Sequence, residues 1–168
     1  AEKGEKMSMQ VREFEERDAG QVARIMFESF RTFLGERMEK DAPESEAYWI
    51  RCSSGKTEHS VTRSFVAEDG GRVIGYLCVS ANTKCGLGVL NVIGVDSDTF
   101  SKGCGRALFH AAESFWKELK MRKIYTCTSH INLRAQAFYK KMGFAEEGRL
   151  KDHFYKGVDE IQLAKFYE

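Results

Sequence analysis

Apolar and polar positions alternate along some stretches of the chain and recur at helical spacing along others. The stretch MQVREF at 9–14 alternates and predicts a first strand. Asp18, with Gln21 three residues later, has the form of an N-cap and capping box. Apolar residues at helical spacing then predict the first helix; they are Val22, Ile25, Met26, Phe30 and Phe33. Pro43, the single proline, predicts the start of a second, shorter helix.

The second half of the chain has stronger strand signals. Two β-rich runs flank Asp69-Gly70-Gly71, which indicates a hairpin. The run GLGVLNVIGVDS at 86–97 is almost continuously apolar and predicts a strand buried on both faces. A helix is expected over 103–120, because Leu108, Ala111, Ala112, Phe115 and Leu119 share one face. KIYTCTSHI then predicts a strand. The segment 132–142 predicts a helix that stops at Gly143, and FAEEGRL and VDEIQLAKFYE predict a closing strand pair.

The predicted order of elements is β-α-α-β-β-β-α-β-α-β-β. Strand, helix and strand around 89–128 imply one parallel, right-handed crossover, and the rest of the sheet is expected to be mostly antiparallel. We therefore expect a mixed, mostly antiparallel sheet with helices on both faces. The polar residues 1–8 are expected to form a flexible N-terminus. With 168 residues in all, the chain fits one domain, which we expect over 9–168.

Composition and charge exclude several classes of function. The chain is 42% hydrophobic and 30% charged, as in ordinary globular proteins, and its net charge is only +1. Such an even balance disfavours a nucleic-acid partner. The first ten residues have no apolar core typical of a signal peptide, and no run of about 18 apolar residues exists to span a membrane. These observations favour a cytoplasmic protein without a membrane partner.

The five cysteines are Cys52, Cys78, Cys85, Cys104 and Cys127. Their count is odd and their spacings are wide, so we expect free thiols in a reducing compartment. Zinc is the alternative, with His59 and His130 as further ligands. The chain has no C-x-x-C or H-x-x-x-H pair, so we expect no metal site.

The segment VDSDTFSKGCGRALF at 95–109 places two glycines at the start of a predicted helix. Gly103 and Gly105 are consistent with a plain turn, because glycine is common in turns. They are equally consistent with a phosphate site, because backbone N–H groups at a helix N-terminus can approach an anion closely. Two sharper motifs are excluded: G-x-x-x-x-G-K-[ST] is absent, and Leu108 stands where a dinucleotide motif needs its third glycine.

A third interpretation fits this segment better. It resembles the acetyl-CoA loop of the GNAT N-acetyltransferase superfamily, whose core is [QR]-x-x-G-x-[GA] after a strand ending in Val. Gly103, Gly105 and their spacing from Val95 match that pattern. Phe100 stands in place of the usual Gln or Arg, and Ser97 in place of a common proline.

A second motif supports the same family. NLRAQAFYKKMGF at 132–144 has the form N-x-x-A-x-x-x-Y-x-x-x-G-F of the fourth-helix motif. The resemblance extends from Met9 to Tyr167, and the tail from 150 loosely resembles ribosomal-protein-alanine N-acetyltransferases. It implies a GNAT-like, seven-stranded mixed sheet whose central strands splay apart.

The resemblance implies acetyl transfer from acetyl-CoA, the co-substrate, directly to a primary amine. Tyr139 would protonate the leaving thiolate, and Asn91 would line the site and orient a water. A backbone N–H near Val95 would polarise the thioester carbonyl. The implied cofactor-binding residues are Ile93, Gly94, Val95, Ser101, Lys102, Gly103, Cys104, Gly105, Arg106, Asn132 and Phe138. Asn132 is also a natural N-cap, and both roles are compatible.

The general base is not identified by the resemblance. The family often has a Glu on the central strand, but residues 89–93 contain no carboxylate. Some relatives have a His five residues before the motif Asn; Cys127 occupies that position, where a buried apolar role is expected. His130 is chemically better suited but fits an ordinary surface residue, and relay through water is the leading hypothesis.

The acceptor is open between a small molecule and a protein N-terminus. Its site would be built from the first two helices and the last strands, with candidate walls at Phe30, Phe33, Tyr48, Trp49, His153, Phe154 and Tyr155. Trp116 is assigned to packing. Two alternatives stay open: a CoA-binding sensor without catalysis, and an acyltransferase for longer acyl-CoAs. A homodimer through the last strands is also open.

Overall fold

The computed structural model describes residues 9–38, 42–99 and 103–167. Its helices are α1 (Ala19–Leu34), α2 (Glu46–Cys52), α3 (Cys104–Glu118) and α4 (Leu133–Lys141). Its strands are β1 (Met9–Glu13), β2 (Gly55–Lys56), β3 (Ser60–Asp69), β4 (Arg72–Asn82), β5 (Leu87–Val95), β6 (Lys123–Ser129), β7 (Ala145–Tyr155) and β8 (Val158–Phe166). The predicted order of elements is confirmed, apart from the two-residue β2 and three short 3-10 turns. The expected flexible segment 1–8 lies outside the described residues.

One mixed sheet runs through the described chain in the order β1-β3-β4-β5-β6-β8-β7, with β2 paired to β3 outside this path. Among the strands of the described residues, β5 and β6 form the one parallel pair, and they are joined through α3 as the sequence predicts. The expected hairpin turns at Gly70–Gly71 between β3 and β4. The mixed, mostly antiparallel fold is therefore confirmed. The seven strands on the main path match the expected number, and β2 is an eighth.

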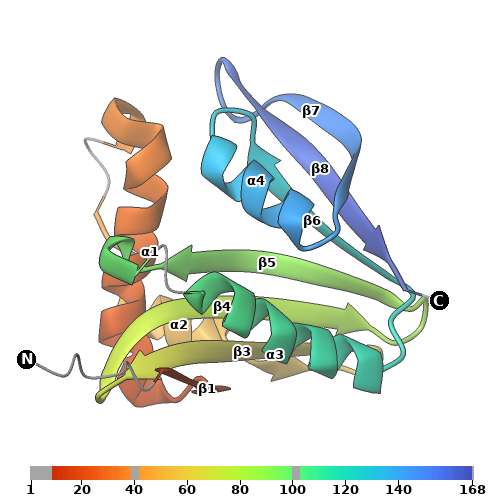
Figure 1. Cartoon of the computed structure of the whole chain (residues 1–168), viewed down its shortest axis with the longest axis horizontal. Coiled ribbons are helices and arrows are strands. Elements are labelled where there is room, and N and C mark those ends of the chain that lie inside the picture. Colours follow the sequence, from red (N-terminus) through yellow and green to blue (C-terminus); the bar gives the residue numbers. More distant parts are fainter. Residues whose placement is uncertain (1–8, 39–41, 100–102, 168) are drawn as a thin grey trace, which may run out of the picture.

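Helices cover both faces of this sheet. Figure 1 shows α3 in front of β3 and β4 and α2 behind them. Two separate buried clusters agree with that arrangement. One joins α3 and α4 to the sheet around Leu108, Trp116 and Ile124, and the other joins α1 and α2 to it around Met26 and Tyr76. The large buried apolar area on each face holds the strands in place, since burial of such side chains contributes about 1.5–3 kcal/mol each.

The central strands separate after a short contact. Residues Leu87–Val89 of β5 pair with Lys123–Tyr125 of β6, and no further pairs follow. Beyond these backbone pairs, a side-chain hydrogen bond still connects the two strands: Thr126 Oγ1 of β6 donates to the Leu90 carbonyl of β5 at 3.0 Å. On its other edge, β5 has a bulge: Leu90 and Val92 pair with consecutive residues of β4, so Asn91 is the extra residue. A bulge bends and twists its strand, and here it accompanies the divergence of β5 from β6 (Figure 1).

The expectation that β5 is buried on both faces is wrong. Gly88, Leu90 and Gly94 are buried, whereas Asn91 is exposed and Val89, Val92 and Ile93 are half-buried. The β5 sequence is apolar throughout because one face of the strand packs on α3, while its other face opens into a cleft between β5 and β6.

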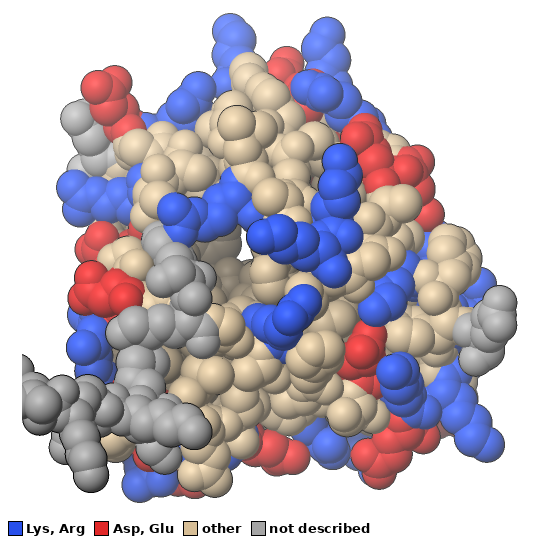
Figure 2. Space-filling view, viewed as in Figure 1, with Lys and Arg blue, Asp and Glu red and all other residues tan. Residues whose placement is uncertain are grey.

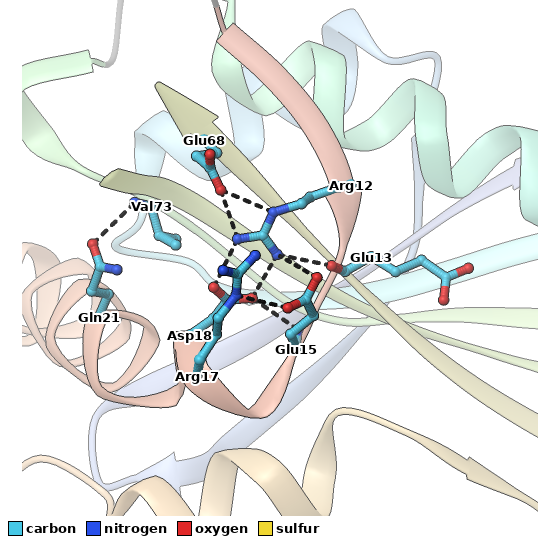
Figure 3. Close-up of polar contacts among 8 residues, drawn as sticks. All are labelled: Arg12, Glu13, Glu15, Arg17, Asp18, Gln21, Glu68 and Val73. Carbon is cyan, nitrogen blue, oxygen red and sulfur yellow. Dashed lines mark hydrogen bonds and ion pairs between the residues drawn. The ribbon is translucent and has the colours of Figure 1, made fainter. Parts of the chain in front are cut away.

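The start of α1 is held by an ion-pair network instead of the predicted capping box. Asp18 makes no cap to its own helix; its carboxylate accepts from the Glu15 N–H at 2.8 Å and from both terminal nitrogens of Arg12. Gln21 instead accepts from the Val73 N–H of β4 at 3.0 Å. Figure 3 shows Arg12 between Asp18 and Glu68, which ties β1, β3 and the start of α1 together.

Removing Arg12 is expected to destabilise the fold strongly. The Asp18 side chain is only 3% exposed, and burial alone would raise its pKa. The Arg12 hydrogen bonds outweigh that effect and hold the Asp18 pKa below its ordinary value. Arg12→Ala leaves this carboxylate without its cation, so we expect a loss of about 3 kcal/mol in unfolding free energy. Urea denaturation measures it.

Arg17→Ala is the matched control for this measurement. The Arg17 side chain is 69% exposed, and its ion pair within the described residues is with the exposed Glu15. Its loss should change stability by less than about 0.5 kcal/mol. Equal effects from the two variants would contradict a structural role of the Arg12–Asp18 pair.

Candidate active site

A cleft of about 1040 Å³ opens where β5 and β6 diverge. It is lined by α1, α2, the middle of β5, most of β6, α4, the end of β7 and one residue of β8. Figure 2 shows the molecule hollowed near the centre of this face, with Lys and Arg side chains gathered around the hollow. The site is therefore a deep, partly apolar groove with a basic rim.

At one end of this face, α3 begins with an unusual glycine. Gly103 is the N-cap residue, with φ 78° and no side chain to bond the first amides. The first helical bond runs from the Ala107 N–H to the Gly103 carbonyl at 3.0 Å, so the amides of Cys104, Gly105 and Arg106 precede it. A Cβ on Gly103 would meet no atom of the described residues within 4 Å. The helix thus presents open N–H donors at the positive end of its dipole, as an anion site requires.

The predicted contacts of this loop fall into three groups. Arg106 is exposed beside the helix start, where its charge can reach an anion. Ser101 and Lys102, together with Phe100, lie outside the described residues. Cys104 is 1% exposed, its thiol faces the Ile74 carbonyl, and burial raises its pKa to about 12. Only the backbone of Cys104 is therefore suited to binding a ligand.

Gly105 has a different role from Gly103. A Cβ at Gly105 would lie 3.2 Å from the ring of Phe138. The residue therefore allows α3 and α4 to approach closely, and Phe138 fills the space that a side chain would need. Phe138 also contacts the ring of Tyr139, 5.5 Å away between centroids. The two predicted cofactor residues Gly105 and Phe138 thus form one packed junction between α3 and α4.

The predicted residues of β5 lie along the cleft and just beyond it. Asn91 and Ile93 line the cleft, Gly94 is buried against α1, and Val95 borders a smaller cavity of about 90 Å³. The Asn91 side chain donates to Ser80 Oγ at 2.8 Å, which fixes its orientation. Because β5 has lost its β6 partner here, alternate backbone groups of 93–95 face away from β4.

The two α4 residues of the second motif also reach the cleft. Asn132 is the N-cap of α4, as expected, and its Oδ1 accepts from the Ala135 N–H at 3.1 Å. Tyr139 lines the cleft although it is only 4% exposed. Burial raises the pKa of Tyr139 to about 12, partly offset by its hydrogen bond with Thr126. The phenol therefore keeps its proton at neutral pH and is available as a donor.

The base candidates named from the sequence are weak in this geometry. The buried role expected for Cys127 is wrong, because this residue is exposed and lines the cleft. Partial burial and then the nearby Glu160 carboxylate raise its thiol pKa. His130 is not among the residues that line the cleft, and its Nδ1 accepts from the Asp159 N–H at 3.0 Å. Sequence reasoning missed Glu160 of β8, which is 5% exposed and lines the cleft.

The expected acceptor walls are brought together. The aromatic residues that line the cleft and were anticipated from the sequence are Phe30, Phe33, Tyr48, Trp49, Phe154 and Tyr155. His153 is not among them; its ring packs on Phe154 at 4.5 Å. Trp116 is fully buried and donates to the Ser80 carbonyl, which confirms its packing role. Among the described buried polar atoms, Ser29 Oγ and Trp49 Nε1 have no partner, and both residues line the cleft.

Two properties of the described residues concern other site types. No three His, Cys, Asp or Glu side chains in these ranges gather closely enough to hold a metal ion. None of the helices in the described chain is long and apolar enough to cross a membrane. All five cysteines are free thiols.

The splayed sheet, the cleft and the glycine-started helix define an acyl- or acetyltransferase. The chain belongs to the acetyltransferase (GNAT) family, whose model matches residues 22–144. Two solved structures illustrate the likeness. Ard1 from Thermoplasma volcanium is 20% identical with a TM-score of 0.77, covering 96% of this chain and 99% of its own. The ribosomal-protein-S18-alanine N-acetyltransferase from Escherichia coli is 19% identical with a TM-score of 0.69, and the match covers 93% of this chain and 92% of its own.

A third structure has the same fold. The ribosomal-protein-alanine N-acetyltransferase from Brucella melitensis is 19% identical with a TM-score of 0.70, covering 94% of this chain and 99% of its own. No curated protein matches the sequence.

Proposed function

We propose that this chain is an N-acetyltransferase that moves the acetyl group of acetyl-CoA directly to a primary amine. The observation that carries the proposal is the parting of β5 and β6 after three residue pairs, beside a helix that begins at a glycine with φ 78°. The first feature leaves strand amides and a cleft for an amide-rich arm, and the second leaves helix amides for a pyrophosphate. Residues 9–168 would form the one acetyltransferase domain.

The residues present fit acetyl-CoA, which would supply an acetyl thioester. The amides of 103–106, with Ser101, Lys102 and the Arg106 side chain, would hold its pyrophosphate. The backbone of 93–95 would pair with the pantetheine arm, and Asn132 and Phe138 would contact it from α4. The open space at Gly103 supports this assignment, because the ligand needs the volume that a Cβ would fill.

Three groups of this chain would act on the reacting atoms. A backbone N–H near Val95 would donate to the thioester carbonyl oxygen and stabilise the charge that develops there. Tyr139 would give its proton to the leaving sulfur, and its pKa of about 12 means that the phenol carries that proton at neutral pH. Asn91, held by Ser80, would line the acceptor side and orient a water.

The acceptor would be a small amine or a protein N-terminus. Two of the solved structures named above are ribosomal-protein-alanine N-acetyltransferases, so a peptide with a free N-terminus belongs among the candidates. Five free thiols and the lack of a basic excess favour a cytoplasmic enzyme without a nucleic-acid or membrane partner. We further propose a homodimer through the edge strand β7 as the alternative to a monomer.

A thiol-release assay tests the proposal. Purified protein with acetyl-CoA is offered phenethylamine, spermidine and a peptide with an N-terminal alanine, with mass detection of products. We expect CoA release that depends on at least one amine and an N-acetyl product. Tight CoA binding without turnover for every amine would instead indicate a sensor. Faster transfer from longer acyl-CoAs would indicate a different acyl donor.

A further inference from the structure

The cleft contains a buried carboxylate to which the family motifs assign no role. Glu160 lies on β8, is 5% exposed and lines the cleft. Its Oε1 accepts from Ser129 Oγ of β6 at 2.6 Å, and the two residues are register partners. Among the described residues, the Ser129 hydroxyl is the one hydrogen-bond donor to the Glu160 carboxylate. A carboxylate buried with a single hydroxyl partner is costly unless a ligand supplies further donors.

The position of Glu160 in the sheet places it on the acceptor side. Side chains alternate between the faces of a strand, so Ser129 and Cys127 share one face of β6. Their register partners Glu160 and Gln162 share the same face of β8. The opposite face of β8 carries Ile161 and packs into the α3 and α4 core. Glu160 is therefore diagonal to Cys127 across the two strands, and its charge contributes to the raised pKa of that thiol.

Inside the basic rim, the residues that line the cleft favour a cation next to Glu160. The charged side chains among the described lining residues are Glu44 and Glu160, and no Lys, Arg or His is included. The other titratable groups that line the cleft are Tyr48, Tyr125, Cys127, Tyr139 and Tyr155. The pKa values of Tyr48, Cys127 and Tyr139 are raised above their ordinary values, so these three groups are uncharged at neutral pH. An amine arrives in water as an ammonium ion, which is the complementary ligand for a buried carboxylate.

We propose that Glu160 binds the ammonium group of the acceptor and accepts its proton, as the general base of the reaction. The proposal rests on the proposed acetyltransferase function. The general base would then lie on β8. This strand pairs with β6, which carries Cys127. Ser129 holds the carboxylate in place, and the aromatic walls contact the rest of the acceptor.

The protons balance in this scheme. Glu160 takes one proton from the ammonium group and becomes a carboxylic acid, which leaves a neutral amine. The amine nitrogen forms its bond to the acetyl carbon, and the carbon–sulfur bond breaks with its electron pair on sulfur. Tyr139 protonates that sulfur, and the second nitrogen proton restores the phenol. Glu160 then releases its proton to solvent.

Glu160→Gln tests the inference with the best amine of the panel. Glutamine keeps an oxygen that can accept from Ser129, so the fold should persist. Without Glu160 as the base, the reaction requires an acceptor amine that has already lost its proton in solution. We expect kcat/KM to fall about 10²-fold near pH 7 and then to rise about tenfold per pH unit up to the amine pKa. The wild-type profile should be flat over that range. Glu160→Asp should restore part of the flat profile.

Glu146→Gln is the matched control, since Glu146 is an exposed carboxylate on β7 and outside the cleft lining. Its profile should overlay the wild-type one. Calorimetry without acetyl-CoA gives a second readout: Glu160→Gln should bind the same amine about tenfold more weakly. A loss in Glu160→Gln that is equal at all pH values, or no loss, would overturn the role of Glu160. Absence of turnover by the wild-type protein would overturn the acetyltransferase function itself.

Discussion

Gly103→Val is expected to weaken acetyl-CoA binding by about 10³-fold. Two charge-assisted hydrogen bonds from helix amides, at roughly 1.5–3 kcal/mol each, account for a change of that size. Within the described part of the chain, no atom lies within 4 Å of a Cβ built at Gly103, so a side chain there would occupy the space that the pyrophosphate needs. In addition, a backbone φ of 78° is strained for a β-branched residue such as valine. Relaxation of the backbone at this position would turn the first amides of α3 away from the pyrophosphate. Titration calorimetry with CoA measures the effect.

A glycine with the same backbone conformation provides the control. Gly71, in the β3–β4 hairpin, has φ 79°, and a Cβ added there would likewise meet no atom within 4 Å. Gly71→Val should cost about 1–2 kcal/mol of stability from backbone strain and leave CoA affinity unchanged. Gly103→Asn separates the two causes at the site, since asparagine tolerates positive φ but still adds a Cβ. Tight CoA binding by both Gly103 variants would refute the pyrophosphate site.

The contrast between Gly103 and Gly105 shows what the sequence could and could not establish. The two glycines look equivalent in the sequence, and both were predicted to approach the cofactor. The structure separates them, because only Gly103 faces open space while Gly105 packs on Phe138. Local signals sufficed where the cause is local: the turn at Gly70–Gly71, the N-cap at Asn132 and the β5–α3–β6 crossover are all confirmed.

Features that depend on register between distant segments were not accessible. An apolar run alone does not reveal that Asn91 is a bulge residue or that β5 leaves β6 after Val89, so burial on both faces was the wrong expectation. Asp18 fits an N-cap by spacing, but Arg12 of β1 and the Glu15 N–H donate to its carboxylate instead. Glu160 falls in an alternating strand, where a polar position usually faces solvent. Only its pairing with Ser129 places it in the cleft.

Tyr139→Phe is expected to lower kcat by about 10³-fold and to leave the affinity for acetyl-CoA nearly unchanged. The substitution removes the proton donor and keeps the ring that packs between Phe138 and Phe144. Loss of the bond with Thr126 should cost only about 1 kcal/mol of stability, because Thr126 still donates to Leu90. Steady-state kinetics with calorimetric CoA binding measures both quantities. Tyr167→Phe, a tyrosine outside the cleft lining, is the control.

The pH dependence separates a Tyr139 acid from a Tyr139 base. Because burial raises the pKa of Tyr139 to about 12, the phenol keeps its proton at all pH values well below that and loses it as pH rises through it. As an acid it is therefore fully active at neutral pH, and kcat should show no alkaline decline from this residue up to about pH 10. As a base it would need ionisation, and kcat would rise with pH over the same range. Tyr139 would not be the proton donor if kcat rose with pH and Tyr139→Phe abolished that rise. Unchanged turnover in Tyr139→Phe would lead to the same conclusion.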